Sequence, residues 1–210
     1  MRIDSTSSLQ VACLGFSANP PRKGHRDAAR RLLYSHRVNE VWLIPVFAHP
    51  FQKEDMESWE HRFLMSGLLD EPGIRTSPIE WEIEEKERRG ASYTLYTVRG
   101  LKEKFPSHTF LWCVGSDIVL DQSYLRWHEW EQLQKEITFL MLERPGYELG
   151  SIQLPECFEL VREYGYNIAR DISSTEVRAM IRLGKDITPH VGKKVAQYIK
   201  EHKLYQTQGR

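Results

Sequence analysis

The run Leu9-Gln10-Val11-Ala12-Cys13-Leu14-Gly15, with the segments that follow it, decides the fold class of this chain. Its nearly continuous apolar residues are typical of a strand that is buried on both faces. The polar stretch from Phe16 to His25 comes next, and the apolar residues of Arg26 to His36 then recur at helical spacing. A strand, a turn and a helix in this order predict the first unit of a parallel sheet.

The same alternation continues along the chain. Further strand-like runs span residues 41–47, 109–115 and 137–142, and amphipathic segments span residues 57–69 and 94–105. This pattern predicts an α/β fold in which helices flank a parallel sheet and the crossovers are right-handed. Such sheets bind ligands beyond the carboxyl ends of their strands. We therefore expect function in the residues from Gly15, Phe47, Gly115 and Glu143 onward.

Composition narrows the class of protein. The 210 residues carry 29 basic and 29 acidic side chains, so no broad charged footprint indicates a nucleic-acid or lipid partner. No apolar run approaches the roughly 18 residues of a membrane helix, and the first ten residues do not resemble a signal peptide. The apolar settings of Cys13 and Cys113 favour reduced, buried thiols. We expect a cytoplasmic protein of one domain over residues 1–210, with a flexible start over residues 1–8.

The segment from Gly15 to His25 is the first candidate site. It lies between a strand and a helix, where backbone N–H groups and the helix dipole favour an anion. It matches neither the Walker A loop nor the G-x-G-x-x-G fingerprint, but it brings Arg22, Lys23 and His25 together. A turn with incidental basic residues is the alternative reading of this spacing.

The second candidate site is Ile172-Ser173-Ser174-Thr175-Glu176-Val177-Arg178. Ser173 and Glu176 form the pattern of a capping box, which predicts a helix start without any function. Capping does not account for Ser174, Thr175 and Arg178, whose hydroxyl and guanidinium groups suit a phosphate. Thr188-Pro189 predicts the start of the last helix, toward His202, within a helical part over residues 172–205.

Together the two segments resemble the nicotinate-nucleotide adenylyltransferases of the nucleotidyltransferase superfamily. That family opens with G-G-[ST]-F-[DN]-P-x-H-x-G-H and closes with I-S-S-T-x-[IV]-R. The resemblance continues in the same order through Lys53, Glu60-His61-Arg62, Ser92-Tyr93-Thr94, Gly115-Ser116-Asp117, Trp127 and Arg144-Pro145-Gly146, and so spans nearly the whole chain. It implies a single nucleotidyltransferase domain with a Rossmann-like fold. It also implies an enzyme that moves AMP from ATP to nicotinate mononucleotide, forming deamido-NAD and pyrophosphate.

The resemblance also implies roles for individual residues. The catalytic residues would be His25, Arg22 and Arg178. The ATP-binding residues would be Gly15, Phe16, Ser17, Gly24, His25, Gly115, Asp117, Arg144, Ile172, Ser173, Ser174 and Arg178. The residues that bind the pyridine mononucleotide would be Lys53, Tyr93, Thr94 and Trp127. Mg²⁺ would arrive with the ATP phosphates rather than in a metal site made by the protein alone, and a homo-oligomer is compatible with the sequence.

Several of these residues have a purely structural alternative. Trp127 can be a core aromatic residue, and Asp117 can cap a helix. Lys53 and Arg62 can be solvated surface charges. His49 and His61 with Asp55 are irregularly spaced for a metal site, which favours surface positions.

The chain departs from the family pattern in its first loop. Arg22 replaces the first histidine of H-x-G-H, Phe16 replaces the second glycine, and Ala18 replaces the phenylalanine. Arg22 can bind phosphate through its planar fork, but it cannot be a neutral donor near pH 7. We expect Arg22→His to retain or raise activity and His25→Ala to remove nearly all of it. The departures leave two other functions open, namely a related transferase with another acceptor (nicotinamide mononucleotide or another phosphate ester) and a nucleotide-binding sensor with little activity.

Overall fold

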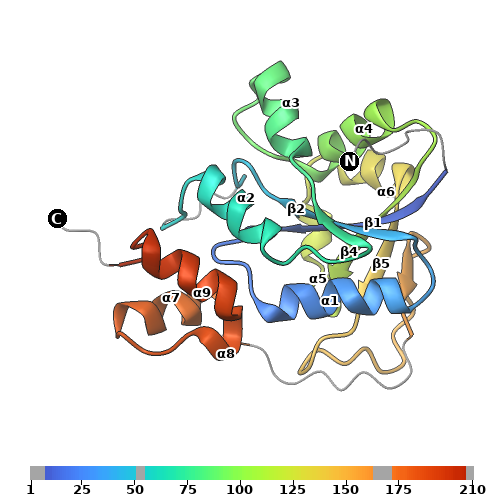
Figure 1. The fold of residues 1–210 in the computed structure, drawn as a ribbon. Helices are drawn as coiled ribbons and strands as arrows, with labels where there is room; N and C mark the ends of the chain where they lie inside the picture. The colour runs from blue at the N-terminus through green and yellow to red at the C-terminus, as the bar shows by residue number, and fades with distance from the viewer. Residues whose placement is uncertain (1–7, 51–54, 163–171, 207–210) are drawn as a thin grey trace.

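A six-stranded parallel sheet forms the centre of the computed structural model, which describes residues 8–50, 55–162 and 172–206 (Figure 1). The strands are β1 (Gln10–Phe16), β2 (Glu40–Pro45), β3 (Ile74–Thr76), β4 (Thr109–Gly115), β5 (Thr138–Leu142) and β6 (Phe158–Leu160). Their order is β3-β2-β1-β4-β5-β6, and each neighbouring pair is parallel. The chain progresses outward in opposite directions from β1 and from β4. Between these two strands such a sheet opens a crevice at its carboxyl edge.

The apolar run of β1 is buried on both faces because successive side chains alternate. Val11 and Cys13 pack into the core on one face of the sheet, and Ala12 and Leu14 pack into the core on the other. All four are buried. This two-sided burial is the reason why the run is uninterrupted by polar residues at these positions.

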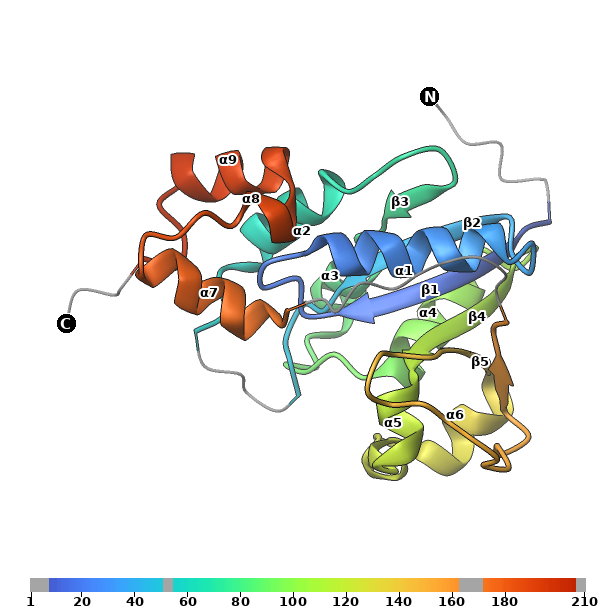
Figure 2. The same cartoon turned by 90° about the horizontal axis from the view of Figure 1, so that it is seen from below.

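Helices cover both faces (Figures 1 and 2). They are α1 (Lys23–Tyr34), α2 (Trp59–Gly67), α3 (Ile79–Glu87), α4 (Thr94–Lys104), α5 (Ser116–Leu120), α6 (Trp130–Glu136), α7 (Ser174–Arg182), α8 (Thr188–Val191) and α9 (Lys193–Glu201), with a short 3₁₀ helix, η1 (Ser123–Arg126). The helices α1, α2 and α7 to α9 share the core that contains Ala12, and α3 to α6 share the core that contains Val11. The expected α/β fold with a helix-flanked parallel sheet is therefore confirmed.

The elements differ from the expected ones at several points. The first helix begins at Lys23 rather than Arg26, so His25 lies in its first turn and not in the loop. The last helix is broken into α8 and α9 at Gly192, whose φ of 85° no helix accommodates. The strands β3 and β6 have three residues each, too few for an apolar run to be seen in the sequence. Among the described residues, no helix is long and apolar enough to cross a membrane.

Candidate functional site

The predicted ATP-binding residues gather at the carboxyl edge of the sheet. Gly15 and Phe16 end β1, Gly24 and His25 lie in the first turn of α1, and Gly115 ends β4. Ser17 follows β1, Asp117 lies in the first turn of α5, Arg144 follows β5, and the others lie at or just before the first turns of α7, whose start is bonded to the start of α1 (Figure 2). The predicted site therefore surrounds the point where the strand order reverses.

Gly15 is required by a close approach between two strands. A Cβ atom at Gly15 would lie 2.5 Å from the Trp112 indole on β4, a distance that real Cβ contacts do not show. Phe16 stands where the family has its second glycine, and its ring lies against the first turn of α1. Its ring centroid lies 4.6 Å from that of the His25 imidazole, so Phe16 supports one side of His25.

Arg22 joins the start of α1 to the start of α7. It is the N-cap residue of α1 and is 8% exposed. Its guanidinium donates from Nε to Ser174 Oγ at 3.0 Å and from Nη1 to the carbonyl of Ile172. These bonds cross about 150 residues of sequence, and they define what we call the Arg22 bridge, made by Arg22, Ile172 and Ser174. The bridge is absent from the sequence expectation, which gave Arg22 a role toward phosphate alone.

The hydrogen bonds of His25 determine its tautomer. The backbone N–H of Arg22 donates to His25 Nδ1 at 3.0 Å, so the neutral ring carries its proton on Nε2. Burial lowers the pKa of His25 well below 6.5, and the positive charges of Arg22 and Arg144 lower it further. His25 is therefore neutral at pH 7. Its Nε2 lies 3.5 Å from Arg22 Nη2, so two hydrogen-bond donors lie side by side.

The start of α7 docks on the loop after β1. Ser173 accepts from the Glu176 N–H at 3.1 Å, and Glu176 accepts from the Ser173 N–H at 2.6 Å, which confirms the predicted capping box. Ser174 Oγ donates to the Pro20 carbonyl at 3.0 Å, and Arg178 Nη1 donates to the Asn19 carbonyl at 2.9 Å. The two predicted halves of the site are thus one connected structure.

A carboxylate that follows β4 and a guanidinium that follows β5 meet at the same edge of the sheet. Asp117 Oδ2 pairs with Arg144 Nη1 at 2.7 Å, and Asp117 makes no helix-capping bond. A Cβ atom at Gly115 would lie 2.3 Å from Asp117 Oδ1 and 2.5 Å from Arg144 Cδ, so only glycine leaves room for this pair. The buried Ser116 hydroxyl accepts from the Arg144 N–H at 3.0 Å and donates to the Tyr147 carbonyl at 2.7 Å. The helix-cap alternative for Asp117 is therefore wrong.

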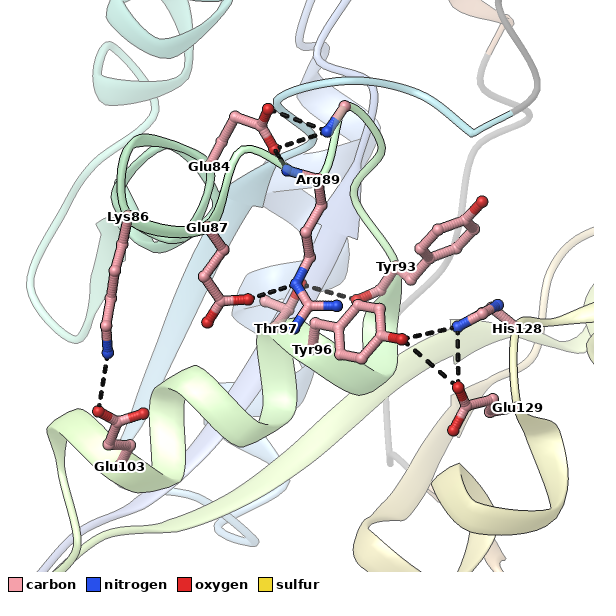
Figure 3. Close-up of polar contacts among 11 residues, drawn as sticks. Glu84, Lys86, Glu87, Arg89, Tyr93, Tyr96, Thr97, Glu103, His128 and Glu129 are labelled. Atoms are coloured by element: carbon pink, nitrogen blue, oxygen red, sulfur yellow. Dashed lines mark hydrogen bonds and ion pairs between the residues drawn. The ribbon is translucent and has the colours of Figure 1, made fainter.

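Of the predicted pyridine-binding residues, Tyr93 belongs to an aromatic group with Tyr96 and His128 at the start of α4 (Figure 3). The Tyr93 ring stacks on His128 with centroids 4.2 Å apart, and His128 Nε2 lies 3.0 Å from the Tyr96 hydroxyl. Thr94 is the first residue of α4. The indole of Trp127 packs edge-on against Phe139, 5.8 Å between centroids, and reaches the core as its structural alternative expects. His128 is a member of this group that the sequence reasoning did not name, although it adjoins Trp127.

Lys53 and Arg62 each had a surface-charge alternative. The structure decides between the alternatives for Arg62, whereas Lys53 lies outside the described residues. Arg62 is only 2% exposed, so its reading as a solvated surface charge is wrong. The His61 ring contacts two aromatic side chains of α9 and the turn after it, and its Nδ1 lies 2.9 Å from the Tyr198 hydroxyl. Among the described residues no cluster of three or more potential metal ligands occurs.

Known proteins resemble this chain over most of its length. Residues 15–180 match the cytidylyltransferase-like family. The chain is 33% identical over 200 residues to a probable nicotinate-nucleotide adenylyltransferase of Bacillus pumilus (strain SAFR-032), and the match covers 94% of this chain and 99% of the relative. It is 30% identical over 201 residues to the nicotinate-nucleotide adenylyltransferase of Bacillus subtilis (strain 168), with coverage of 94% and 99%.

Similarity also extends to solved structures. The fold is similar to that of Plasmodium falciparum nicotinic acid mononucleotide adenylyltransferase complexed with NaAD, with a TM-score of 0.71 and 20% sequence identity. That match covers 93% of this chain and 97% of the other. At this identity the likeness establishes the shared fold.

Proposed function

We propose, from the fact that the chain belongs to the nicotinate-nucleotide adenylyltransferase family, that it moves AMP from ATP to nicotinate mononucleotide. The products are deamido-NAD and pyrophosphate. The observation that carries the proposal is the cluster of hydrogen-bond donors at the carboxyl edge, where Arg22 and His25 adjoin and Arg178 docks on the same loop. The breadth of the sequence match to relatives of this activity supports it.

The donors suit the triphosphate of ATP. Two donors that face each other at 3.5 Å, Arg22 Nη2 and His25 Nε2, cannot satisfy one another and fit a shared phosphate oxygen. Arg178 Nε is buried and finds no hydrogen-bond partner among the described residues. A buried donor without an acceptor is energetically costly, so a bound phosphate oxygen would supply the missing acceptor for Arg178 Nε. We assign the same role to the N-terminal turns of α1 and α7, with Gly24, Ser173 and Ser174.

The edge near Asp117 suits the nucleoside part. Asp117 Oδ1 is buried and without a hydrogen-bond partner among the described residues, so it can accept from a hydroxyl or amino group. Arg144 holds the other carboxylate oxygen and lies close enough to His25 to lower its pKa. We propose that Gly115, Asp117 and Arg144 bind the adenosine side of ATP while Arg144 also faces its phosphates.

Transfer needs no covalent enzyme intermediate. An oxygen of the acceptor phosphate forms a bond to the α-phosphorus of ATP, and the bond from that phosphorus to the bridging oxygen breaks, releasing pyrophosphate. The attacking phosphate is already ionised near pH 7, so no side chain has to remove a proton from it. His25 donates a hydrogen bond through Nε2 and the arginines supply positive charge. Catalysis on this proposal rests on positioning and charge stabilisation.

Mg²⁺ belongs to the substrate in this proposal. The groups nearest the proposed phosphate site are guanidinium groups and a neutral imidazole, and its carboxylate, Asp117, is paired with Arg144. These nitrogen groups donate hydrogen bonds to phosphate oxygens, but they offer no oxygen ligands to Mg²⁺. We propose that the ion enters on ATP, held by phosphate oxygens and water.

The acceptor would bind beside Tyr93 and Thr94. The start of α4 offers backbone N–H groups to an anionic group, and Tyr93 and His128 offer aromatic surface beside it. We propose that Trp127, which precedes His128 in the chain, also borders the acceptor. Its packing against Phe139 limits how much of the indole a ligand can stack on.

A pyrophosphate-release assay with Mg²⁺, ATP and a panel of acceptors tests the function. We expect turnover with nicotinate mononucleotide and much weaker turnover with nicotinamide mononucleotide. Turnover with another acceptor alone would replace the proposed substrate. ATP binding without turnover on any acceptor would instead identify a nucleotide sensor.

We further propose that the whole chain is one nucleotidyltransferase domain. The C-terminal helices do not form a core of their own. Val177 of α7 and Ile199 of α9 pack in the same core as Ala29 of α1 and Leu14 of β1. Separating residues 172–205 from the rest would expose that shared core.

A further inference from the structure

A buried pair of opposite charges lies beside the carboxyl end of β2, outside the residues assigned so far. Arg62 of α2 is 2% exposed and Glu80 of α3 is 8% exposed. Charged side chains are almost never this buried unless their hydrogen bonds are satisfied. The partners that satisfy them show what the pair holds in place.

Arg62 binds backbone carbonyls from three segments. Its guanidinium donates to Ser17 at 3.0 Å, to Val46 at 2.5 Å and to Phe47 at 2.9 Å, and its Nε donates to Glu57 at 2.9 Å. Burial lowers the pKa of Arg62 to about 10, so it stays charged at pH 7. Arg62 therefore ties the end of β1 to the end of β2.

Glu80 binds donors from two other segments. Its Oε2 accepts from the Phe47 N–H at 2.9 Å, and its Oε1 accepts from the Thr97 hydroxyl at 3.1 Å. The Ser92 hydroxyl also lies within hydrogen-bond range of Glu80 and accepts from the Ala48 N–H at 3.2 Å. The Ser92 N–H donates to the Ala48 carbonyl at 2.8 Å. Glu80 thus joins the segment after β2 to the start of α4.

Arg62 and Glu80 bind the backbone of the same residue after β2 and otherwise bind different segments. The Phe47 peptide group is held at its carbonyl by Arg62 and at its N–H by Glu80. The hydrogen bonds of Glu80 reach Phe47, Ser92 and Thr97, whereas Arg62 bonds the Ser17 carbonyl in the loop from Gly15 to His25. Thr97 in turn contacts the Tyr93 carbonyl at 3.3 Å. Glu80 is therefore bonded directly to the segments beside the proposed acceptor site, and it is linked to the loop after β1 through the Phe47 backbone and Arg62.

Stability alone is a poor reason to bury such a pair. Well-packed apolar residues of similar volume often stabilise a protein as much or more. A carboxylate with several fixed donors does, however, hold those donors in one arrangement, as substrate positioning requires. We propose that Glu80 is a positioning residue that orients Tyr93 and Thr94 for the acceptor mononucleotide. The inference rests on the proposed function, since it presumes that the acceptor binds there.

Glu80→Gln tests this inference with little change in volume. The amide cannot accept from both Phe47 N–H and the Thr97 hydroxyl through two oxygens, so one contact is lost. We expect the KM for the acceptor to rise about tenfold, as for one lost buried hydrogen bond, with the KM for ATP changed less than about twofold. Glu82→Gln is the matched control, because Glu82 lies on the same helix and pairs with Lys104 at the surface. It should leave both constants unchanged.

A second pair of variants guards against misfolding of Glu80→Gln. Thr97→Val removes the hydroxyl donor and should raise the acceptor KM, whereas Thr97→Ser keeps the donor and should not. Equal changes in both KM values, or a loss of thermal stability with no change in KM, would overturn the inference while leaving the proposed function intact. A wild-type protein that turns over no acceptor would refute the proposed function and this inference with it.

Discussion

Replacing Arg22 with methionine tests both the bridge that this side chain makes in the structure and its proposed contact with phosphate. Arg22 is 8% exposed, and its guanidinium makes the Arg22 bridge to the Ile172 carbonyl and Ser174 Oγ. Methionine preserves much of the volume but donates no hydrogen bond. Loss of two charge-assisted bonds, one of which leaves the Ile172 carbonyl without this donor, should cost about 2–3 kcal/mol. For a protein of this size that corresponds to a fall in Tm of roughly 4–12 °C.

The same substitution should also slow transfer. Removal of one preorganised donor to a developing negative charge costs on the order of 10²–10³ in kcat. Thermal unfolding and pyrophosphate release measured on one preparation would give both numbers. Arg37→Met is the control, because Arg37 pairs with Glu159 while its side chain is 56% exposed, and such surface pairs contribute roughly 0–1 kcal/mol.

Two results would refute this reasoning. A Tm within about 1 °C of the wild type would show that the Arg22 bridge does not hold α7. An unchanged kcat would remove Arg22 from the proposed phosphate site. Arg22→His adds a third measurement, since the sequence predicts retained or raised activity, whereas the structure adds a lower Tm because the shorter imidazole cannot span Ile172 and Ser174.

Four further outcomes follow from the site. His25→Ala should remove nearly all activity, and an unchanged kcat would contradict the assignment of the first turn of α1. The pKa of His25 is held well below 6.5 by burial and by Arg22 and Arg144, so the neutral donor persists as the pH falls through 6.5, and any loss of kcat there should follow protonation of the acceptor phosphate and not of His25. Arg144→Met should raise this pKa toward 6.5, as followed by NMR titration, and a wild-type His25 that titrates near 6.5 would sink the argument. Gly115→Ala should raise the KM for ATP because its Cβ displaces Asp117 and Arg144, whereas Gly67→Ala, which meets no atom within 4 Å, should be neutral.

Some residues of the site were predictable from the sequence and others were not. The loop after β1 and the capping box at Ser173 were predictable because each is a local pattern of a few residues. The start of α1 was placed three residues late, since Arg22 is an unusual N-cap whose backbone N–H is satisfied by His25. Glu80 gave no signal, because it stands among the many glutamates of α3 and only burial distinguishes it.

The sequence by itself determined the α/β class and the family, because both rest on patterns that are read along the chain: apolar periodicity for the class and ordered short motifs for the family. Only the tertiary structure decided which charges are buried and what they hold. The Arg22 bridge joins residues about 150 positions apart, and Arg62 and Glu80 hold one peptide group from two different helices. Such contacts depend on how the helices pack against the sheet, and no spacing within a single segment encodes them.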